Sequence, residues 1–298
     1  MEEILVIDIG GTKTNISVVT SCGGGREIII QSSNIIQTNS NPEITIEKIH
    51  SAIYSGSQKN NSSYLSLSLP GLWDKNGVLK ESNFLKNWID YPFITKLQNQ
   101  LKIKDVIWES DVICGALGEY NALAETLRAT SLLYINLGTG IGAAFIDDEG
   151  KVFQSKSNLT LRIQNLVYPF EDELTSGVSL ICGGSLTEIS KYKTIENLFN
   201  DYRAGKIEAF DLISKAQLEL AAWLINLFYL FAPDIIVLNG GLTYGWEVLC
   251  EEAIAIANEE LNNQVKILPS KLKEMAPIYG GYLNFMRHCE EQSDKAIR

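Results

Sequence analysis

The sequence predicts an α/β fold built from two related halves. Short runs rich in Val, Ile, Leu and Tyr alternate with helical patterns along the 298 residues. Two of these runs turn back over glycines in the same way, VIDIGGTKTNISVV at 6–19 and YINLGTGIGAAFI at 134–146. The hydrophobic fraction of 45% gives ample core for one large domain or two of ordinary size.

Each predicted strand is apolar, and Gly, Asp or Pro often bounds it. The predicted strands are 4–9, 15–20, 26–31, 64–70, 105–110, 132–137, 142–147 and 234–239. Helical patterns lie between them, at 41–56, 112–127, 206–231 and 246–261. Asn41 is the expected N-cap of the first helix, with Pro42 at its first position. The end of 206–231 is apolar on all sides, which predicts that it is buried.

The repeated hairpin predicts two domains whose glycine turns face a common cleft. We expect the boundary near Val112, so that 1–111 form the first domain and 112–275 the second. Residues 289–298 are polar and unpatterned, which predicts a disordered tail.

Composition argues against several classes of protein. The net charge of −11 argues against binding to nucleic acid, and no apolar run reaches the roughly twenty residues that span a bilayer. The N-terminus has no basic region followed by an apolar stretch, so no signal peptide is expected. Five scattered cysteines without a CxxC predict a reduced cytoplasmic protein, and only two histidines make a structural zinc site improbable.

The glycine turns fit neither of the common nucleotide loops. GTGIG at 138–142 lacks the GxGxxG spacing, GGTKT at 10–14 lacks the P-loop spacing, and both lead into strands rather than helices. A strand–turn–strand phosphate site remains, in which glycines let backbone N–H groups approach an anion. Asp8 would face the phosphates through Mg²⁺. The alternative is a pair of ordinary hairpins. The candidate phosphate contacts are Gly10, Gly11, Thr12, Lys13, Thr14, Gly138, Thr139 and Gly140.

Several motifs, in order from about residue 4 to 285, resemble the ROK (repressor, ORF, kinase) sugar kinases of the hexokinase–actin ATPase superfamily. The two hairpins resemble the family's phosphate motifs, and APDIIVLNGGL at 232–242 resembles its adenosine motif, with Gly240 and Gly241 against the nucleotide. SLSLPGLWDKNGVLKESNFLKNW at 66–88 resembles the segment leading to the sugar pocket. ESDVICGALGE at 109–119 resembles the segment that carries the catalytic Asp. The small residues at 276–283 resemble the family's closing helix, which implies that a helix at 276–288 returns to the first domain.

The resemblance implies a two-domain ribonuclease H-like fold with ATP, Mg²⁺ and a sugar in the inter-domain cleft. It implies an ATP-dependent kinase of glucose or an N-acetylated hexosamine, with Asp111 as general base. The residues agree, because Asp111 follows a strand and begins a helix whose N-terminus favours a carboxylate. A plain N-cap is the alternative for Asp111. Asn83 matches a sugar-binding residue or is a turn residue. A homodimer is usual in the family.

The substrate half departs from the family pattern. Ser110 stands where the family has Asn, and Arg162 and Asn165 stand near the places of a sugar-binding Glu and His. The family's next sugar-binding Glu falls within 170–177. Asp172 fits its spacing best, although Glu171 and Glu173 are alternatives. Residues 150–176 lack Cys and His, so no zinc is expected. We therefore expect unusual sugar specificity or weak activity. The alternatives are an N-acetylglucosamine/BadF-type kinase and a nucleotide-binding switch protein.

Overall fold

The computed structural model describes residues 3–22, 27–54, 62–124, 130–154, 161–170, 173–176, 181–190 and 192–297. The chain forms two compact units: unit 1 is 1–118 with 275–298, and unit 2 is 119–274. The boundary therefore lies inside α3 (Asp111–Ala124), not at its start as the sequence suggested. The first turns of α3 stay with unit 1 because Gly118 and Gly280 bring this helix against the backbone of α8 (Ala276–Ile297).

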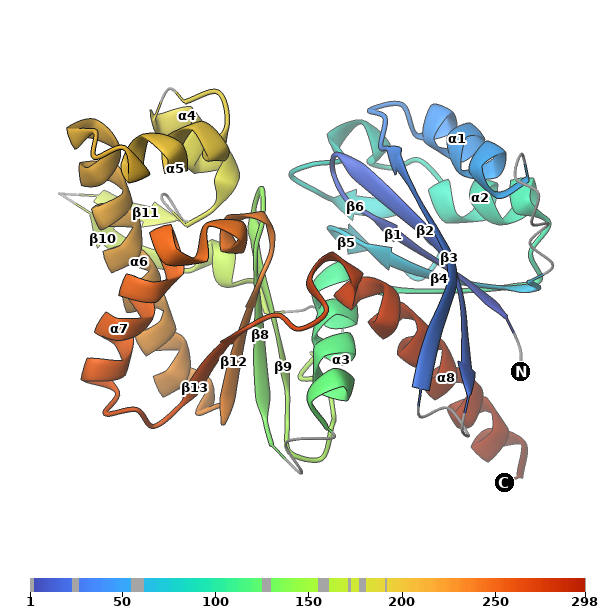
Figure 1. Ribbon diagram of the computed structural model, residues 1–298. Coiled ribbons are helices and arrows are strands. Elements are labelled where there is room, and N and C mark those ends of the chain that lie inside the picture. The colour runs from blue at the N-terminus through green and yellow to red at the C-terminus, as the bar shows by residue number, and fades with distance from the viewer. Residues whose placement is uncertain are drawn as a thin grey trace. The chain divides into compact units, whose positions relative to one another are not determined.

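The sheet of unit 1 has the order β3-β2-β1-β4-β7 (Figure 1). The first three strands of the chain pair antiparallel, whereas β1 pairs parallel with β4 and β4 with β7. The carboxyl ends of β1, β4 and β7 consequently meet at one edge of the sheet. The strands are β1 (Ile4–Ile9), β2 (Lys13–Cys22), β3 (Glu27–Gln37), β4 (Tyr64–Leu69) and β7 (Asp105–Ser110).

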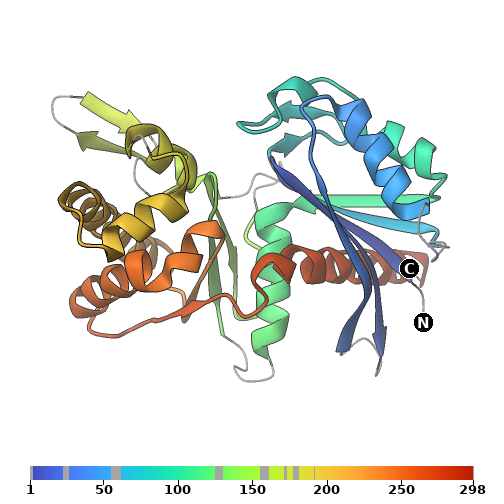
Figure 2. The ribbon, with the colours of Figure 1, turned by 45° about the horizontal axis from the view of Figure 1, so that its top comes forward.

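Helices cover both faces of this sheet, which explains why β1 is apolar without interruption until Asp8 (Figure 2). Leu5, Ile7 and Ile9 pack with α1 (Pro42–Tyr54) and α2 (Phe93–Leu101). Ile4 and Val6 point the other way and pack with α8. The predicted cap of α1 is confirmed, since the Glu43 amide donates to Asn41 Oδ1 at 2.9 Å. The short strands β5 (Leu72–Trp73) and β6 (Leu79–Glu81) form a hairpin.

The expected disordered tail at 289–298 is wrong for the described residues, because α8 continues to Ile297. Its earlier turns are fixed by Ile278, Tyr282 and Phe285 in the core of unit 1. Adding residues to an anchored helix requires no new nucleation. Polar composition alone therefore misidentified the end of this helix.

Unit 2 repeats the strand plan of unit 1. Its sheet has the order β13-β12-β8-β9, with an antiparallel β8–β9 hairpin and parallel pairs between β8 and β12 and between β12 and β13. The internal repeat predicted from the two glycine hairpins is thus present in the topology. The strands are β8 (Leu132–Leu137), β9 (Ile141–Ile146), β12 (Ile235–Asn239) and β13 (Lys266–Pro269), and β10 (Val167–Phe170) pairs with β11 (Glu173–Ser176).

The helices of unit 2 pack on one face of this sheet around a core that includes Leu133, Leu137 and Leu238. They are α4 (Gly183–Ser190), α5 (Ile195–Arg203), α6 (Ile207–Phe231) and α7 (Glu251–Glu260). The end of α6 is less buried than predicted, since Tyr229 and Leu230 are 66% and 64% exposed. None of the helices in the described part of the chain combines the length and apolarity needed to cross a membrane.

A buried carboxylate fixes the segment through which the chain leaves unit 2. Glu119 is fully buried and accepts hydrogen bonds from Ser270 Oγ at 2.5 Å, the Lys271 amide at 3.0 Å and the Leu272 amide at 2.8 Å. Because these donors satisfy the carboxylate, its burial is compatible with a stable fold. The first residue of unit 2 therefore holds the stretch that precedes the return to unit 1.

Candidate active site

In unit 1, the turn between β1 and β2 is held from within and open to solvent. The Gly10 amide donates to the Lys13 carbonyl at 2.8 Å, and the Thr38 amide donates to the Thr12 carbonyl at 3.0 Å. Thr38 Oγ1 donates to the Gly10 carbonyl at 2.9 Å. Gly11, Thr12 and Lys13 are exposed. The backbone is thus fixed while these residues stay available to a ligand.

Thr14 contributes to this turn differently from its neighbours. Its side chain is fully buried, and its Oγ1 lies 2.8 Å from Thr38 Oγ1. Because the single Thr38 hydroxyl proton goes to the Gly10 carbonyl, Thr14 is the donor of this bond. Thr14 therefore has no hydroxyl proton left for a phosphate, and we leave it out of the contacts proposed below.

Two carboxylates lie at the carboxyl ends of β1 and β7, beside this turn. Asp8 is the penultimate residue of β1, and Asp111 follows β7 as the first residue of α3. The Val112 amide donates to Asp111 Oδ1 at 2.9 Å, and Ser68 Oγ donates to Asp8 Oδ1 at 2.5 Å. The sheet therefore brings together residues that are about a hundred positions apart in the sequence.

The surroundings of both carboxylates disfavour negative charge. Burial raises the pKa of Asp8 to about 7; the hydrogen bond from Ser68 opposes this shift, and the charge of Asp111 adds to it. Burial raises the pKa of Asp111 to about 6, against the opposing effect of the Val112 amide. The helix N-terminus thus does not outweigh burial, but a pKa near 6 still leaves Asp111 ionised at neutral pH. Burial also raises the pKa of the adjacent Cys114 thiol, which stays protonated.

The segment at 66–88, which is predicted to lead to the sugar pocket, lies against the turn between β1 and β2. A Cβ placed on Gly11 would lie 2.8 Å from the Phe84 Cβ, so the turn and the residue after Asn83 are in contact. Asn83 is exposed, and Phe84 is 44% exposed. Ser110 is the last residue of β7, and its Oγ lies 3.5 Å from Asp111 Oδ1. Both predicted sugar contacts of unit 1 are thus close to the turn or to Asp111.

In unit 2, the turn Gly138–Gly140 between β8 and β9 packs against the start of α4. The Gly183 amide donates to the Gly138 carbonyl at 2.8 Å, and the Gly184 amide donates to the Thr139 carbonyl at 2.9 Å. A Cβ on Gly184 would lie 2.9 Å from that Thr139 oxygen. The glycine pair therefore lets α4 approach the backbone of the turn, while Thr139 stays exposed.

Gly240 brings the end of β12 against the same turn. It has a φ of +99°, and a Cβ on it would lie 2.5 Å from the Leu137 carbonyl carbon and oxygen and 2.8 Å from Asn136 Oδ1. Gly241 is exposed, and a Cβ placed on it would have no heavy atom of the described residues within 4 Å. The predicted nucleotide-binding residues of unit 2 therefore lie together, where the end of β12 approaches the backbone of the turn between β8 and β9.

Replacing Gly240 by Ala should destabilise unit 2 by about 3 kcal/mol, because the new methyl group meets backbone atoms and the left-handed φ is unfavourable. Urea unfolding followed by circular dichroism measures this change. Gly241→Ala is the matched control and should change the free energy of unfolding by no more than about 0.5 kcal/mol. Equal stabilities of the two variants would contradict the close approach of β12 to the turn.

The remaining predicted substrate residues lie elsewhere in unit 2. Arg162 and Asn165 flank a short turn, and the Asn165 amide donates to the Arg162 carbonyl at 2.9 Å. This turn follows a bridge between Leu161 and Ala143 of β9. Asp172 lies outside the described residues. No sugar-binding role for these residues follows from the geometry alone.

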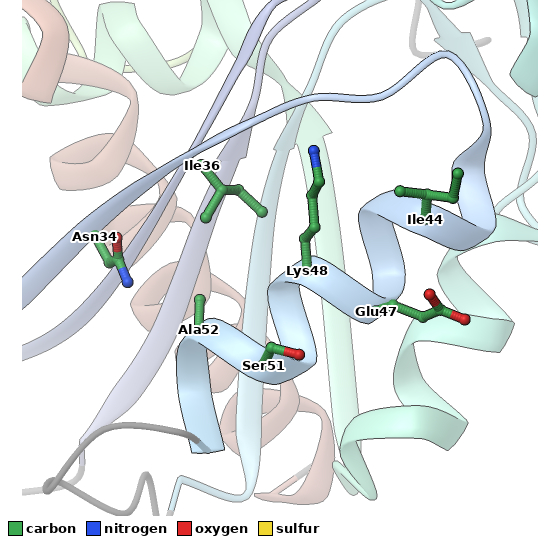
Figure 3. Close-up of a pocket in the computed structure, with 7 residues that line it drawn as sticks. All are labelled: Asn34, Ile36, Ile44, Glu47, Lys48, Ser51 and Ala52. Carbon is green, nitrogen blue, oxygen red and sulfur yellow. The ribbon is translucent and has the colours of Figure 1, made fainter.

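A hollow of about 510 Å³ lies between β3 and α1, away from these residues (Figure 3). Ile36 and Lys48 stand on its two sides, and Lys48 Nζ donates to the Gln37 carbonyl at 3.3 Å. Asn34, Ile44, Glu47, Ser51 and Ala52 complete its lining. The hollow contains none of the predicted site residues, so its volume does not locate the chemistry.

Sequence reasoning missed three supports of the site: Thr38, Ser68 and the pair Gly183–Gly184. The serines of YLSLSL gave a usable signal, because polar residues at alternate positions of a buried strand require partners. The pair of glycines ahead of SLTEIS was another. Thr38 had no comparable signal, because its partners lie 24 to 28 residues away.

Comparison with known proteins finds relatives along most of the chain. An uncharacterized protein of Clostridium perfringens is 27% identical over 297 residues, which cover 94% of this chain and 96% of the relative. The glucokinase of Thermotoga maritima is 20% identical over 93% of this chain and 95% of its own length. An N-acetyl-D-glucosamine kinase of Vibrio parahaemolyticus is 28% identical over 63% of this chain and 68% of its own.

Solved structures support the predicted α/β, two-domain fold. A ROK family glucokinase from Streptomyces griseus, in complex with glucose and AMPPNP, matches with a TM-score of 0.74 at 19% identity. The match covers 94% of this chain and 97% of that one. A ROK family transcriptional regulator also matches, with a TM-score of 0.74 at 15% identity over 94% of this chain and 76% of its own. The sequence model of the ROK family matches residues 4–156, slightly more than half of the chain. This protein therefore belongs to the ROK family.

Proposed function

We propose that this protein is an ATP-dependent kinase that phosphorylates a hydroxyl of glucose or of an N-acetylated hexosamine. The observation that carries the proposal is the pair Asp8 and Asp111, close enough for their charges to interact and placed beside an open glycine turn. The glucokinase and N-acetyl-D-glucosamine kinase relatives support the substrate class.

The residues of each unit fit a bound nucleotide. In unit 1, the exposed backbone of Gly11 and Thr12, with Lys13, would contact phosphate, and Asp8 would hold the Mg²⁺ that accompanies ATP. In unit 2, Gly240 leaves no room for a side chain against the turn Gly138–Gly140, and the backbone of this turn and of Gly241 would contact the nucleotide. Bound ATP supplies the phosphoryl group, and Mg²⁺ offsets its negative charge.

Asp111 supplies the base for this reaction. Its carboxylate would accept the proton of the sugar hydroxyl as that hydroxyl attacks phosphorus. A base works best when its pKa lies near the working pH, and the pKa of about 6 meets this condition while leaving the group ionised at pH 7. We further propose that Asn83 and Ser110 bind sugar hydroxyls, and that Arg162, Asn165 and Asp172 contribute to sugar choice.

Other parts of the proposal rest on composition. The five cysteines are scattered along the sequence without a CxxC, which supports a reducing, cytoplasmic setting. We include no structural zinc, because residues 150–176 contain neither Cys nor His. We retain the homodimer as part of the proposal, to be tested by light scattering.

The test is ADP release from Mg²⁺-ATP in the presence of a panel of hexoses and N-acetylated hexosamines. We expect turnover that depends on one or a few sugars. Tight ATP binding without turnover on any sugar would favour the nucleotide-binding switch, a relevant outcome because the family also contains a transcriptional regulator. A protein that binds no ATP would overturn both functions.

A further inference from the structure

Ser68 occupies a place where the fold would normally bury an apolar side chain. It lies in β4, where Leu65, Leu67 and Leu69 are almost completely buried, and it is itself fully buried. In the parallel pairing of β1 and β4, Ser68 stands directly opposite Asp8. Side chains at opposed positions share a face of the sheet, so the hydroxyl is directed to the carboxylate by the strand register.

The hydrogen bond between these residues gives the two carboxylate oxygens of Asp8 different surroundings. Ser68 Oγ lies 2.5 Å from Asp8 Oδ1 and has only one proton to donate. Among the described residues, Asp8 Oδ2 has no hydrogen-bond partner, and it is not among the buried polar atoms that lack one, so it keeps contact with solvent. One oxygen is therefore fixed inside the protein and the other is available to a ligand.

We propose that Ser68 is a positioning residue for Asp8, holding Oδ1 so that Oδ2 is the oxygen presented to the divalent cation of a bound nucleotide. This inference rests on the proposed function. Without the hydroxyl, the carboxylate could rotate about its Cβ–Cγ bond, and part of the binding free energy would be lost in ordering it.

Ser66 gives a closely matched control. It lies two residues earlier in β4, on the same face, and is also fully buried. Its hydroxyl donates to the Gly281 carbonyl at 2.7 Å and not to Asp8. Ser66→Ala and Ser68→Ala thus remove the same atom from the same strand, but only the second removes a partner of Asp8.

The experiment is a titration of Mn²⁺ into the full-length protein with bound ADP, read by electron paramagnetic resonance. We expect Ser68→Ala to weaken Mn²⁺ binding about tenfold, the scale of a lost hydrogen bond to a charged group, and Ser66→Ala to leave it within about twofold. Ser68→Cys keeps a weak donor of similar size and should fall between wild type and Ser68→Ala. It also replaces Ser68→Ala as the test variant if that protein does not fold. In the kinase assay of Ser68→Ala, the Mg²⁺ concentration that gives half the maximal rate should rise, while the KM for sugar stays unchanged.

Two results would overturn the inference while leaving the kinase proposal intact: wild-type Mn²⁺ affinity in Ser68→Ala, or equal losses in Ser66→Ala and Ser68→Ala. The second would show a general effect of altering β4. If the wild-type protein itself binds no Mn²⁺ with nucleotide, the proposed function fails, and this inference fails with it.

Discussion

Asp111→Asn should lower the kcat of sugar phosphorylation by about 10² to 10⁴, the usual contribution of a general base. The amide keeps an oxygen that can accept the Val112 hydrogen bond, so the geometry at the start of α3 is retained. What the variant lacks is a group that takes up the hydroxyl proton. The KM for sugar should change little, because the loss concerns the transition state.

The pH dependence gives an independent check on this base. Because the pKa of Asp111 is about 6, the wild-type rate should fall roughly tenfold per pH unit below pH 6 as the carboxylate becomes protonated. The residual rate of Asp111→Asn should not show this fall below pH 6. Asp105→Asn, at the exposed other end of β7, is the control and should keep both the rate and the profile of the wild type. A full rate in Asp111→Asn would remove Asp111 from the mechanism.

The same substitution should raise stability. The pKa of Asp111 is higher in the folded protein than its ordinary value of 3.8, so the folded state binds the proton more readily than the unfolded chain. The free energy of unfolding therefore falls as pH rises from about 4 to about 6, and the penalty is present in full above that range. Asp111→Asn removes the buried charge, and its Tm at pH 7.5 should exceed that of the wild type. An unchanged or lower Tm would contradict the burial of this charge.

The second large effect is expected at Gly280, where α8 crosses α3. A Cβ on Gly280 would lie 1.6 Å from the Cys114 carbonyl oxygen and 2.4 Å from its carbon, both in the backbone of α3. Helix propensity alone predicts that Gly280→Ala gains about 1 kcal/mol. The clash should reverse this sign and cost roughly 3 kcal/mol or more, because two helix backbones must separate.

Gly281→Ala separates packing from propensity. Gly281 lies in the same helix, so helix propensity predicts the same gain in stability. Its new methyl group, however, would meet a side-chain atom, Val6 Cγ1, at 2.6 Å. We expect a smaller loss of stability than in Gly280→Ala, measured by urea unfolding. Since α3 begins with Asp111, Gly280→Ala should also lower kcat under conditions where the protein is folded. A more stable Gly280→Ala protein would show that the helices do not touch there.

The parts of this fold that could be predicted from sequence depend on neighbours in the chain. The two glycine hairpins and the Asn41 cap are formed within a few residues, so composition and spacing suffice. The bond from Ser68 to Asp8 joins residues 60 positions apart, and Glu119 binds a segment about 150 positions away. Such partners are set by strand order and register, which no local pattern encodes. The exposure of Tyr229 escaped prediction for the same reason, since an apolar helix end does not reveal which neighbours cover it.

The return of α8 to the first sheet has a consequence for the order in which the protein is made. Ile4 and Val6 leave the ribosome early, but Ile278, Tyr282 and Phe285, which cover that face of β1, follow only after all of unit 2 has been synthesised. Domains fold as units while translation proceeds, so unit 2 can complete its core first. The nascent chain must therefore carry an open apolar sheet face until unit 2 has been synthesised, and truncation before α8 would leave that face exposed to aggregation.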